Sequence, residues 1–187
     1  MKLLNKLLHY YRKLFWSLEK QACHAGVNLG ENNFIASHFW SSEPYLITIG
    51  SHNAITMGVK MFTHGGGRAV RNILSNFDCF GKIKIGDYVY IGNNALIMPG
   101  VTIGNNVLIA AGSVVTKSIP DNVCVGGNPA VILCTIDEYV KRNIDYNLDS
   151  KNLNIADKKE LLLHLDDSKF IRKRFMSSKP SKIDKGL

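Results

Sequence analysis

Aliphatic residues recur at every sixth position through the middle of the chain. With one break, the series consists of Ile49, Ile55, Met61, Ile85, Ile91, Ile97, Ile103, Ile109 and Val115. A spacing of six matches neither the 3.6-residue period of an α-helix nor the two-residue alternation of a lone strand. It is typical of a short strand plus a corner, repeated so that three hexads close a triangular coil and the aliphatic side chains of successive coils stack inside.

Turn-forming residues hold a fixed place in the same hexads. Three positions after the aliphatic residue stand Gly58, Asn94, Gly100, Asn106 and Gly112. Glycine and asparagine tolerate the positive φ that tight corners require. The pattern therefore predicts an all-β core, a parallel β-helix over residues 25–134.

The stretch between Met61 and Ile85 interrupts this series. Its phase positions are Gly67, Ile73 and Cys79, which do not sustain the aliphatic pattern. We expect residues of about 65–84 to form a loop expelled from the coil, and loops of this length are usually functional.

Both ends of the chain have helical patterns. Residues 1–24 are predicted to form one amphipathic helix, with Leu7, Tyr11 and Leu14 on its apolar face and Lys and Arg opposite. We expect this helix to pack on the coil or on another copy. The second interpretation is that residues 2–20 contact a membrane surface, because basic amphipathic helices favour anionic lipid. Residues 135–187 are predicted to hold a helical segment and a basic tail, frayed over residues 178–187.

Composition narrows the class of partner. The chain has 187 residues, of which 45% are hydrophobic and 20% charged, which excludes a disordered chain. The formal charge of +8 lies at the ends, since residues 21–140 carry seven acidic and six basic side chains. No nucleic-acid partner is expected, because such a partner requires a basic stripe on the folded body. The four cysteines show no C-x-x-C spacing, which favours reduced thiols in a cytoplasmic compartment. The expected location is therefore the bacterial cytoplasm, and the second interpretation of residues 2–20 adds the inner face of its membrane.

His64 stands out among the six histidines. It lies at a corner position, where a side chain faces out of the coil, and it opens the expelled loop. Three glycines at positions 65–67 clear side-chain bulk beside it and let a substrate or another chain approach. A neutral imidazole is suited to take a proton from a hydroxyl group, so His64 is the candidate catalytic base.

These features resemble the hexapeptide-repeat acyltransferases, whose fold is a left-handed parallel β-helix. The segment Phe62-Thr63-His64-Gly65-Gly66 looks like the catalytic histidine of the galactoside, maltose and xenobiotic O-acetyltransferase branch, and more locally like capsule and lipopolysaccharide sugar O-acetyltransferases. Many of those relatives have Asp where this chain has Gly65, so the partner that orients the imidazole stays open, with a backbone carbonyl as one alternative.

The resemblance also implies a reaction and an assembly. It implies direct transfer of acetyl from acetyl-CoA to a sugar hydroxyl, with no metal, in a homotrimer that sets His64 of one subunit against the donor groove of the next. N-acetylation of an amino sugar and a non-catalytic scaffold stay open as alternatives. A metal-dependent carbonic anhydrase on this coil is disfavoured, because it needs two histidines five apart and the chain has none.

The later repeats resemble the donor site of this family. Residues 109–120 read I-A-A-G-S-V-V-T-K-S-I-P where the family has I-G-A-G-S-V-V-T-K-D-I-P, and residues 125–130 read V-G-G-N-P-A. The resemblance implies that Ala111 and Thr116 line the pantetheine groove through main-chain groups. It places Lys117 near the nucleotide phosphates and Asn93 at a turn that touches the substrates.

The resemblance implies a carbohydrate acceptor. The residues that would bind it are chosen by their residue types alone. Tyr88 and Tyr90, with Phe77 and Phe80, are expected to cluster at the return of the loop, where aromatic faces could stack on a sugar ring. Arg68 and Arg71 in the loop are expected to meet an anionic acceptor or the donor phosphates.

Overall fold

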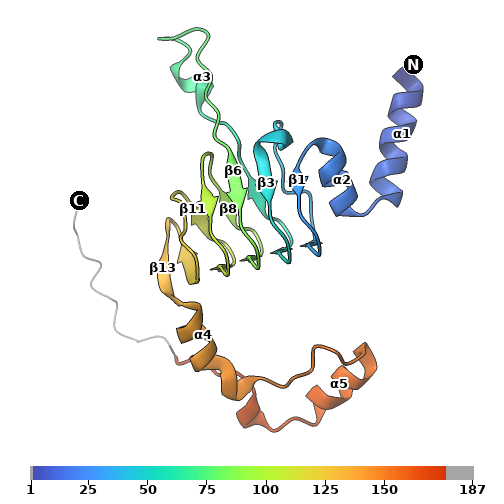
Figure 1. The fold of residues 1–187 in the computed structure, drawn as a ribbon, viewed down its shortest axis with the longest axis vertical. Helices are drawn as coiled ribbons and strands as arrows, with labels where there is room; N and C mark the ends of the chain where they lie inside the picture. The colour runs from blue at the N-terminus through green and yellow to red at the C-terminus, as the bar shows by residue number, and fades with distance from the viewer. Residues whose placement is uncertain (1, 176–187) are drawn as a thin grey trace, which may run out of the picture. The chain divides into compact units, whose positions relative to one another are not determined.

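Three sheets form the three sides of a coil (Figure 1), in a computed structural model that describes residues 2–175. Sheet 1 contains β1 (Asn28–Leu29), β3 (Ile47–Ile49), β6 (Ile83–Ile85) and β9 (Thr102–Ile103). Sheet 2 contains β2 (Phe34–Ile35), β4 (Ala54–Ile55), β7 (Tyr90–Ile91), β10 (Leu108–Ile109), β12 (Val123–Gly127) and β13 (Ala130–Thr135). Sheet 3 contains β5 (Lys60–Met61), β8 (Leu96–Ile97) and β11 (Val114–Val115). Successive coils pair in parallel, so the predicted parallel β-helix is confirmed.

The interior of the coil is filled by the residues that the six-residue series picks out. All nine of its aliphatic positions are buried, and none is more than 4% exposed. Residues two positions earlier also face inward, and two of them, Asn53 and Ser113, are polar. Asn53 is satisfied by the backbone: its Nδ2 donates to Gly86 O at 3.0 Å and its Oδ1 accepts from Val89 N at 2.6 Å.

The first coil is irregular but complete. Phe39 is fully buried, and its carbonyl accepts a hydrogen bond from Met61 N at 2.7 Å. Phe39 thus takes the place that β5, β8 and β11 occupy in later coils. The chain then passes through a short 3₁₀ helix, η1 (Pro44–Leu46), before it enters β3.

The predicted loop leaves the coil after β5 and returns at β6, where Figure 1 shows it projecting beyond the coil. Stacked partners are 36 residues apart across it, at Met61 and Ile97, but 18 apart in the next coil, at Ile97 and Val115. The loop therefore adds the length of one whole coil, which is why the six-residue phase is the same on both sides. It contains a short helix, α3 (Gly67–Val70), and its phase residue Ile73 is 76% exposed.

The single helix predicted over residues 1–24 is wrong, because the chain forms two helices there. These are α1 (Lys2–Phe15) and α2 (Leu18–Ala25). Ser17 has an extended backbone, and its Oγ accepts from Lys20 N at 3.3 Å, so it caps a new helix instead of continuing the first. Ala22 of α2 is buried in the core of the coil.

The other end of the coil closes with an antiparallel hairpin. β13 pairs antiparallel with β12, so the parallel pattern predicted through residue 134 stops one strand earlier. The helix α4 (Ile136–Asn143) follows at once. Its start is fixed by a reciprocal cap: Glu138 N donates to Thr135 Oγ1 at 3.1 Å, and Thr135 N donates to Glu138 Oε2 at 2.9 Å.

The chain divides into two compact units between Tyr139 and Val140. The second unit contains η2 (Ile144–Tyr146), α5 (Ile155–Leu163) and η3 (Asp167–Lys169). None of its described residues, 140–175, is buried. The predicted frayed tail at 178–187 lies outside the described residues. Within residues 2–175, the helices fall short of the length and apolarity that a bilayer crossing requires.

Replacing the buried amide of Asn53 tests how the corners are held. Asn53→Ala leaves Val89 N and Gly86 O without their side-chain partner, and we expect a loss of about 2 kcal/mol in the free energy of unfolding, measured by urea denaturation. Asn93→Ala is the matched control, because Asn93 is exposed. Equal stability of the two variants would contradict this role of the interior amide.

Candidate active site

His64 lies where the chain leaves sheet 3 for the loop. The residue follows β5 by three positions, and it forms an isolated antiparallel bridge with Phe80, where the loop returns. Gly81 N donates to Thr63 O at 2.8 Å and closes the neck of the loop. The side chain of His64 is 39% exposed and therefore reaches solvent, while these backbone contacts hold the residue in place.

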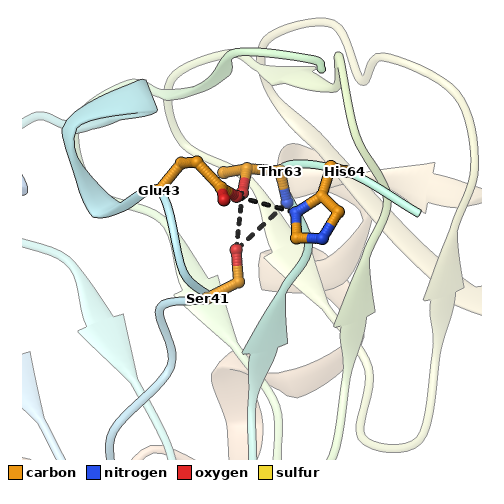
Figure 2. A network of polar contacts seen from close by, with 4 residues as sticks. All are labelled: Ser41, Glu43, Thr63 and His64. Carbon is orange, nitrogen blue, oxygen red and sulfur yellow. Dashed lines mark hydrogen bonds and ion pairs between the residues drawn. The ribbon is translucent and has the colours of Figure 1, made fainter. Parts of the chain in front are cut away.

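The partner of the imidazole is Glu43, as Figure 2 shows. His64 Nδ1 lies 2.7 Å from Glu43 Oε2, and Thr63 Oγ1 donates to the same oxygen at 2.6 Å. Ser41 Oγ lies 2.6 Å from Thr63 Oγ1 and completes the network. The partner of the ring, which the sequence left open, is thus a carboxylate from the preceding coil and not a backbone carbonyl.

The network fixes the proton positions. A carboxylate only accepts hydrogen bonds, so Nδ1 of His64 and the hydroxyl of Thr63 both donate to it. Because the Thr63 proton is directed to Glu43, Ser41 donates to Thr63. In the neutral imidazole the proton therefore lies on Nδ1, and Nε2, which points away from Glu43 in Figure 2, keeps a free lone pair.

The environment of Glu43 favours its charged form. The hydrogen bond from Thr63 is the main cause that lowers the pKa of Glu43 below its ordinary value, and desolvation opposes it in part. Hydrogen bonds from His64 and Ser42 act in the same direction as that from Thr63. The carboxylate of Glu43 is consequently ionised at neutral pH, where it accepts the hydrogen bond from Nδ1 of His64.

A cavity of about 600 Å³ opens beside His64. Its walls come from the neck of the loop and from the next coil, and they are lined by Phe62, Gly65, Cys79, Phe80, Gly81, Leu96, Met98, Pro99 and Gly100. His64 and Cys79 are the ionisable side chains of this lining. A Cβ on Gly81 would lie 2.2 Å from Gly100 N, so only glycine lets the returning chain pass this close to the next coil.

The residues predicted for the donor site divide between two corners of the coil. Thr116 and Lys117 follow β11 and lie on the same corner as His64, two coils further along. Asn93 and Ala111 lie on a different corner, between sheets 2 and 3, where the chain enters sheet 3. All four are exposed. Lys117 also lines a cavity of about 300 Å³ between the last coil and the β12–β13 hairpin.

The residues predicted for the acceptor are not gathered at His64 in one chain. Phe80 does lie beside His64, with 5.6 Å between the two ring centroids. Tyr88 instead lies on the corner between sheets 1 and 2, stacked on His52 at 4.7 Å, and Tyr90 is on the outer face of sheet 2. The expected cluster is wrong here because the chain turns onto another side of the coil within these few residues.

The loop arginines differ from one another. Arg71 Nε donates to Phe77 O at 3.2 Å, so this side chain braces the loop. Arg68, on α3, is exposed and available to a ligand. The structure thus gives Arg71 a role in shaping the loop that its residue type did not indicate.

Sequence reasoning missed Glu43, Ser41 and Cys79. One signal for Glu43 was present, since it is the single acidic residue between Glu31 and Asp78. The irregular first coil hid its proximity to His64, because Glu43 lies 21 residues before it, not one regular coil of 18. Cys79 enters the cavity only because the loop folds back.

Fold and site together define a class of protein: a hexapeptide-repeat β-helix with a histidine–carboxylate pair at the mouth of an apolar cavity. Residues 82–117 match the family model described as bacterial transferase hexapeptide (six repeats). Protein CapG of Staphylococcus aureus is 49% identical over 129 residues, which cover 67% of this chain and 73% of CapG.

Two further proteins extend the comparison. Galactoside O-acetyltransferase of Escherichia coli (strain K12) is 33% identical over 130 residues, which cover 67% of this chain and 63% of that protein. The crystal structure of a maltose O-acetyltransferase from Clostridium difficile 630 aligns with a TM-score of 0.52 and 26% identity, over 72% of this chain and 89% of that one. This chain therefore belongs to the hexapeptide-repeat acetyltransferases and has their left-handed parallel β-helix fold. It spans less than two thirds of the galactoside enzyme.

The lowered pKa of Glu43 predicts how stability depends on pH. A carboxyl whose folded pKa is below its unfolded value stabilises the fold above the ordinary Glu pKa, about 4.3, and that contribution is lost as pH falls through the lowered value. We expect urea denaturation to find Glu43→Gln less stable than the wild type at pH 7, with the difference shrinking below pH 4. Glu31→Gln, at an exposed position, is the control. A difference that does not change with pH would contradict the assignment.

Proposed function

We propose that this protein transfers an acetyl group from acetyl-CoA to a hydroxyl group of a sugar or glycan, with His64 as the general base. The observation that carries the proposal is the pair formed by His64 and Glu43, which leaves Nε2 unprotonated at the mouth of a cavity. General bases of this kind accelerate a reaction about 10²–10⁴-fold.

The reaction is a direct transfer. Nε2 of His64 takes the proton of the acceptor hydroxyl while the acceptor oxygen forms a bond to the thioester carbonyl carbon. Glu43 stabilises the imidazolium that results, because its carboxylate already accepts the Nδ1 proton. The carbon–sulfur bond then breaks, and the imidazolium returns its proton to the leaving sulfur, so that coenzyme A leaves as the thiol and His64 is neutral again.

The acceptor is assigned as carbohydrate on two grounds. Two similar proteins are named galactoside and maltose O-acetyltransferases. In this chain, Phe62 and Phe80 line the cavity beside the base, and aromatic faces pack well on sugar rings. An exposed Arg68 in the loop suits an acceptor that carries negative charge.

The donor site supports assembly into a homotrimer. Ala111 and Asn93 lie on a different corner from His64, so a single chain does not bring them together. A threefold arrangement sets the His64 corner of one subunit against the Ala111 corner of the next, which completes a site from two chains. Thr116 and Lys117, on the His64 corner, then flank the donor further along the coil.

The N-terminal helix supports a secondary contact with the inner face of the cytoplasmic membrane. Leu14 and Phe15 of α1 are at least 70% exposed, and Arg12 and Lys13 lie beside them. Exposed apolar residues next to basic ones favour an anionic lipid surface.

Replacing His64 tests the base. His64→Ala should lower turnover at least a hundredfold and leave the affinity for coenzyme A nearly unchanged, as measured by thiol release and by calorimetry. Turnover within a few-fold of the wild type would remove His64 from the mechanism.

Cys79 supplies the matched control, because it is the other ionisable side chain in the cavity. Cys79→Ala should keep turnover within about threefold, since direct transfer needs no nucleophile on the protein. A loss as large as that of His64→Ala, with acetyl found on Cys79 by mass spectrometry, would replace direct transfer by an acyl-enzyme.

Complementation tests the shared site. Ala111→Trp should block the donor groove, and His64→Ala should remove the base, so each variant alone is inactive. Trimers co-expressed from equal amounts of both should recover about a quarter of wild-type activity, because one site in four combines an intact base with an intact groove. No recovery, in mixed trimers verified by mass spectrometry, would place the base and the groove in one chain.

A further inference from the structure

A second cavity, of about 400 Å³, lies where the two N-terminal helices meet the first coil. Its chemistry differs from that of the catalytic cavity, since aromatic and basic side chains predominate. The principal lining residues are Arg12, Lys13, Trp16, His24, His38 and Trp40. The proposed acetyl transfer uses none of them.

The two indoles of this cavity are held in place. Trp40 is half-buried and makes edge contacts with the buried ring of Phe39, at 5.1 Å, and with His38, at 4.9 Å. Trp16 has Lys20 Nζ at 4.4 Å and Arg12 Cζ at 5.4 Å from its ring centroid. Both rings are thus fixed by neighbours yet partly open to the cavity.

The charge of the cavity is unbalanced. Arg12 and Lys13 have no ion pair within the described residues, and the lining contains no carboxylate. Glu19 is the single acidic residue among the first 30, and its Oε1 accepts the hydrogen bond of Ile35 N at 3.2 Å. Two basic side chains therefore line a cavity that has no acidic residue in its lining.

We infer that this cavity binds a nucleoside diphosphate group, free or as the activated end of a nucleotide sugar. A guanidinium and an ammonium group recognise phosphate oxygens, and two charges need a ligand with more than one negative charge. The ring of Trp16 is covered by Arg12 and Lys20, so the half-buried ring of Trp40 is the one that offers a face to a base. Stacking on aromatic side chains is how proteins commonly hold a base. The volume is within the range of small-molecule sites.

Tryptophan emission provides a direct measurement, because Trp16 and Trp40 are the two tryptophans of the chain. Uridine diphosphate, titrated into the full-length protein, should change this emission in a saturable manner. The double variant Arg12→Gln/Lys13→Gln should bind at least tenfold more weakly. Lys84→Gln should bind like the wild type, because it removes an exposed charge on sheet 1, outside the cavity.

The titration is made with coenzyme A already saturating, so that nucleotide binding at the donor site does not contribute. Unchanged thermal unfolding and unchanged acetyl transfer in the double variant would show that the fold and the catalytic site are intact. Binding of inorganic pyrophosphate or glucuronate as tight as that of uridine diphosphate would overturn the inference, since neither combines a base with a diphosphate. It would also be overturned if no probe changed the emission, or if only phosphatidylglycerol vesicles did, in which case the cavity belongs to a membrane contact.

Discussion

The narrow interior of the coil is the constraint on which the rest of the structure depends. Each side of a coil contributes a few inward side chains, and the nine aliphatic residues of the six-residue series fill that space with almost no exposure. Neighbouring strands in a sheet lie about 4.8 Å apart, so equivalent residues of successive coils form columns. Among the described residues, charged side chains are thereby excluded from the interior and lie at the corners or on the outer faces of the sheets, where their position along the coil decides which of them can meet.

The expelled loop leaves the stacking of the interior residues unchanged. Because the loop adds the length of one coil, the aliphatic columns continue from Met61 to Ile97 as if nothing intervened. The chain must leave and return at the same corner, and the bridge between His64 and Phe80 closes that neck. The bridge to Phe80 therefore holds His64 at the neck of the loop, and the cavity beside it is built from the neck and the following coil.

The fold could be predicted from the sequence because its period is a direct consequence of stacking, and the outward direction of the His64 side chain because the residue lies at a corner before glycines. Glu43 could not be predicted, since the irregular first coil shifts its distance from His64 away from the regular repeat. The division of the N-terminal helix was hidden for a different reason. The apolar face continues from Leu14 to Leu18, whereas in the structure Ser17 between them has an extended backbone and accepts a hydrogen bond from Lys20 N.

The polar residues that do enter the interior show how the site is coupled to the core. Asn53 and Ser113 use their side chains to satisfy backbone groups of the corners. Thr63 is just as buried, but its hydroxyl donates to Glu43 instead. Leaving the buried hydroxyl of Thr63 without an acceptor would cost more than the hydrogen bond contributes, so Thr63 favours the position in which the carboxylate of Glu43 also accepts from His64. The packing of the coil thus contributes to the orientation of the imidazole of His64, and a change that loosens the coil near Thr63 reaches this ring through one carboxylate oxygen.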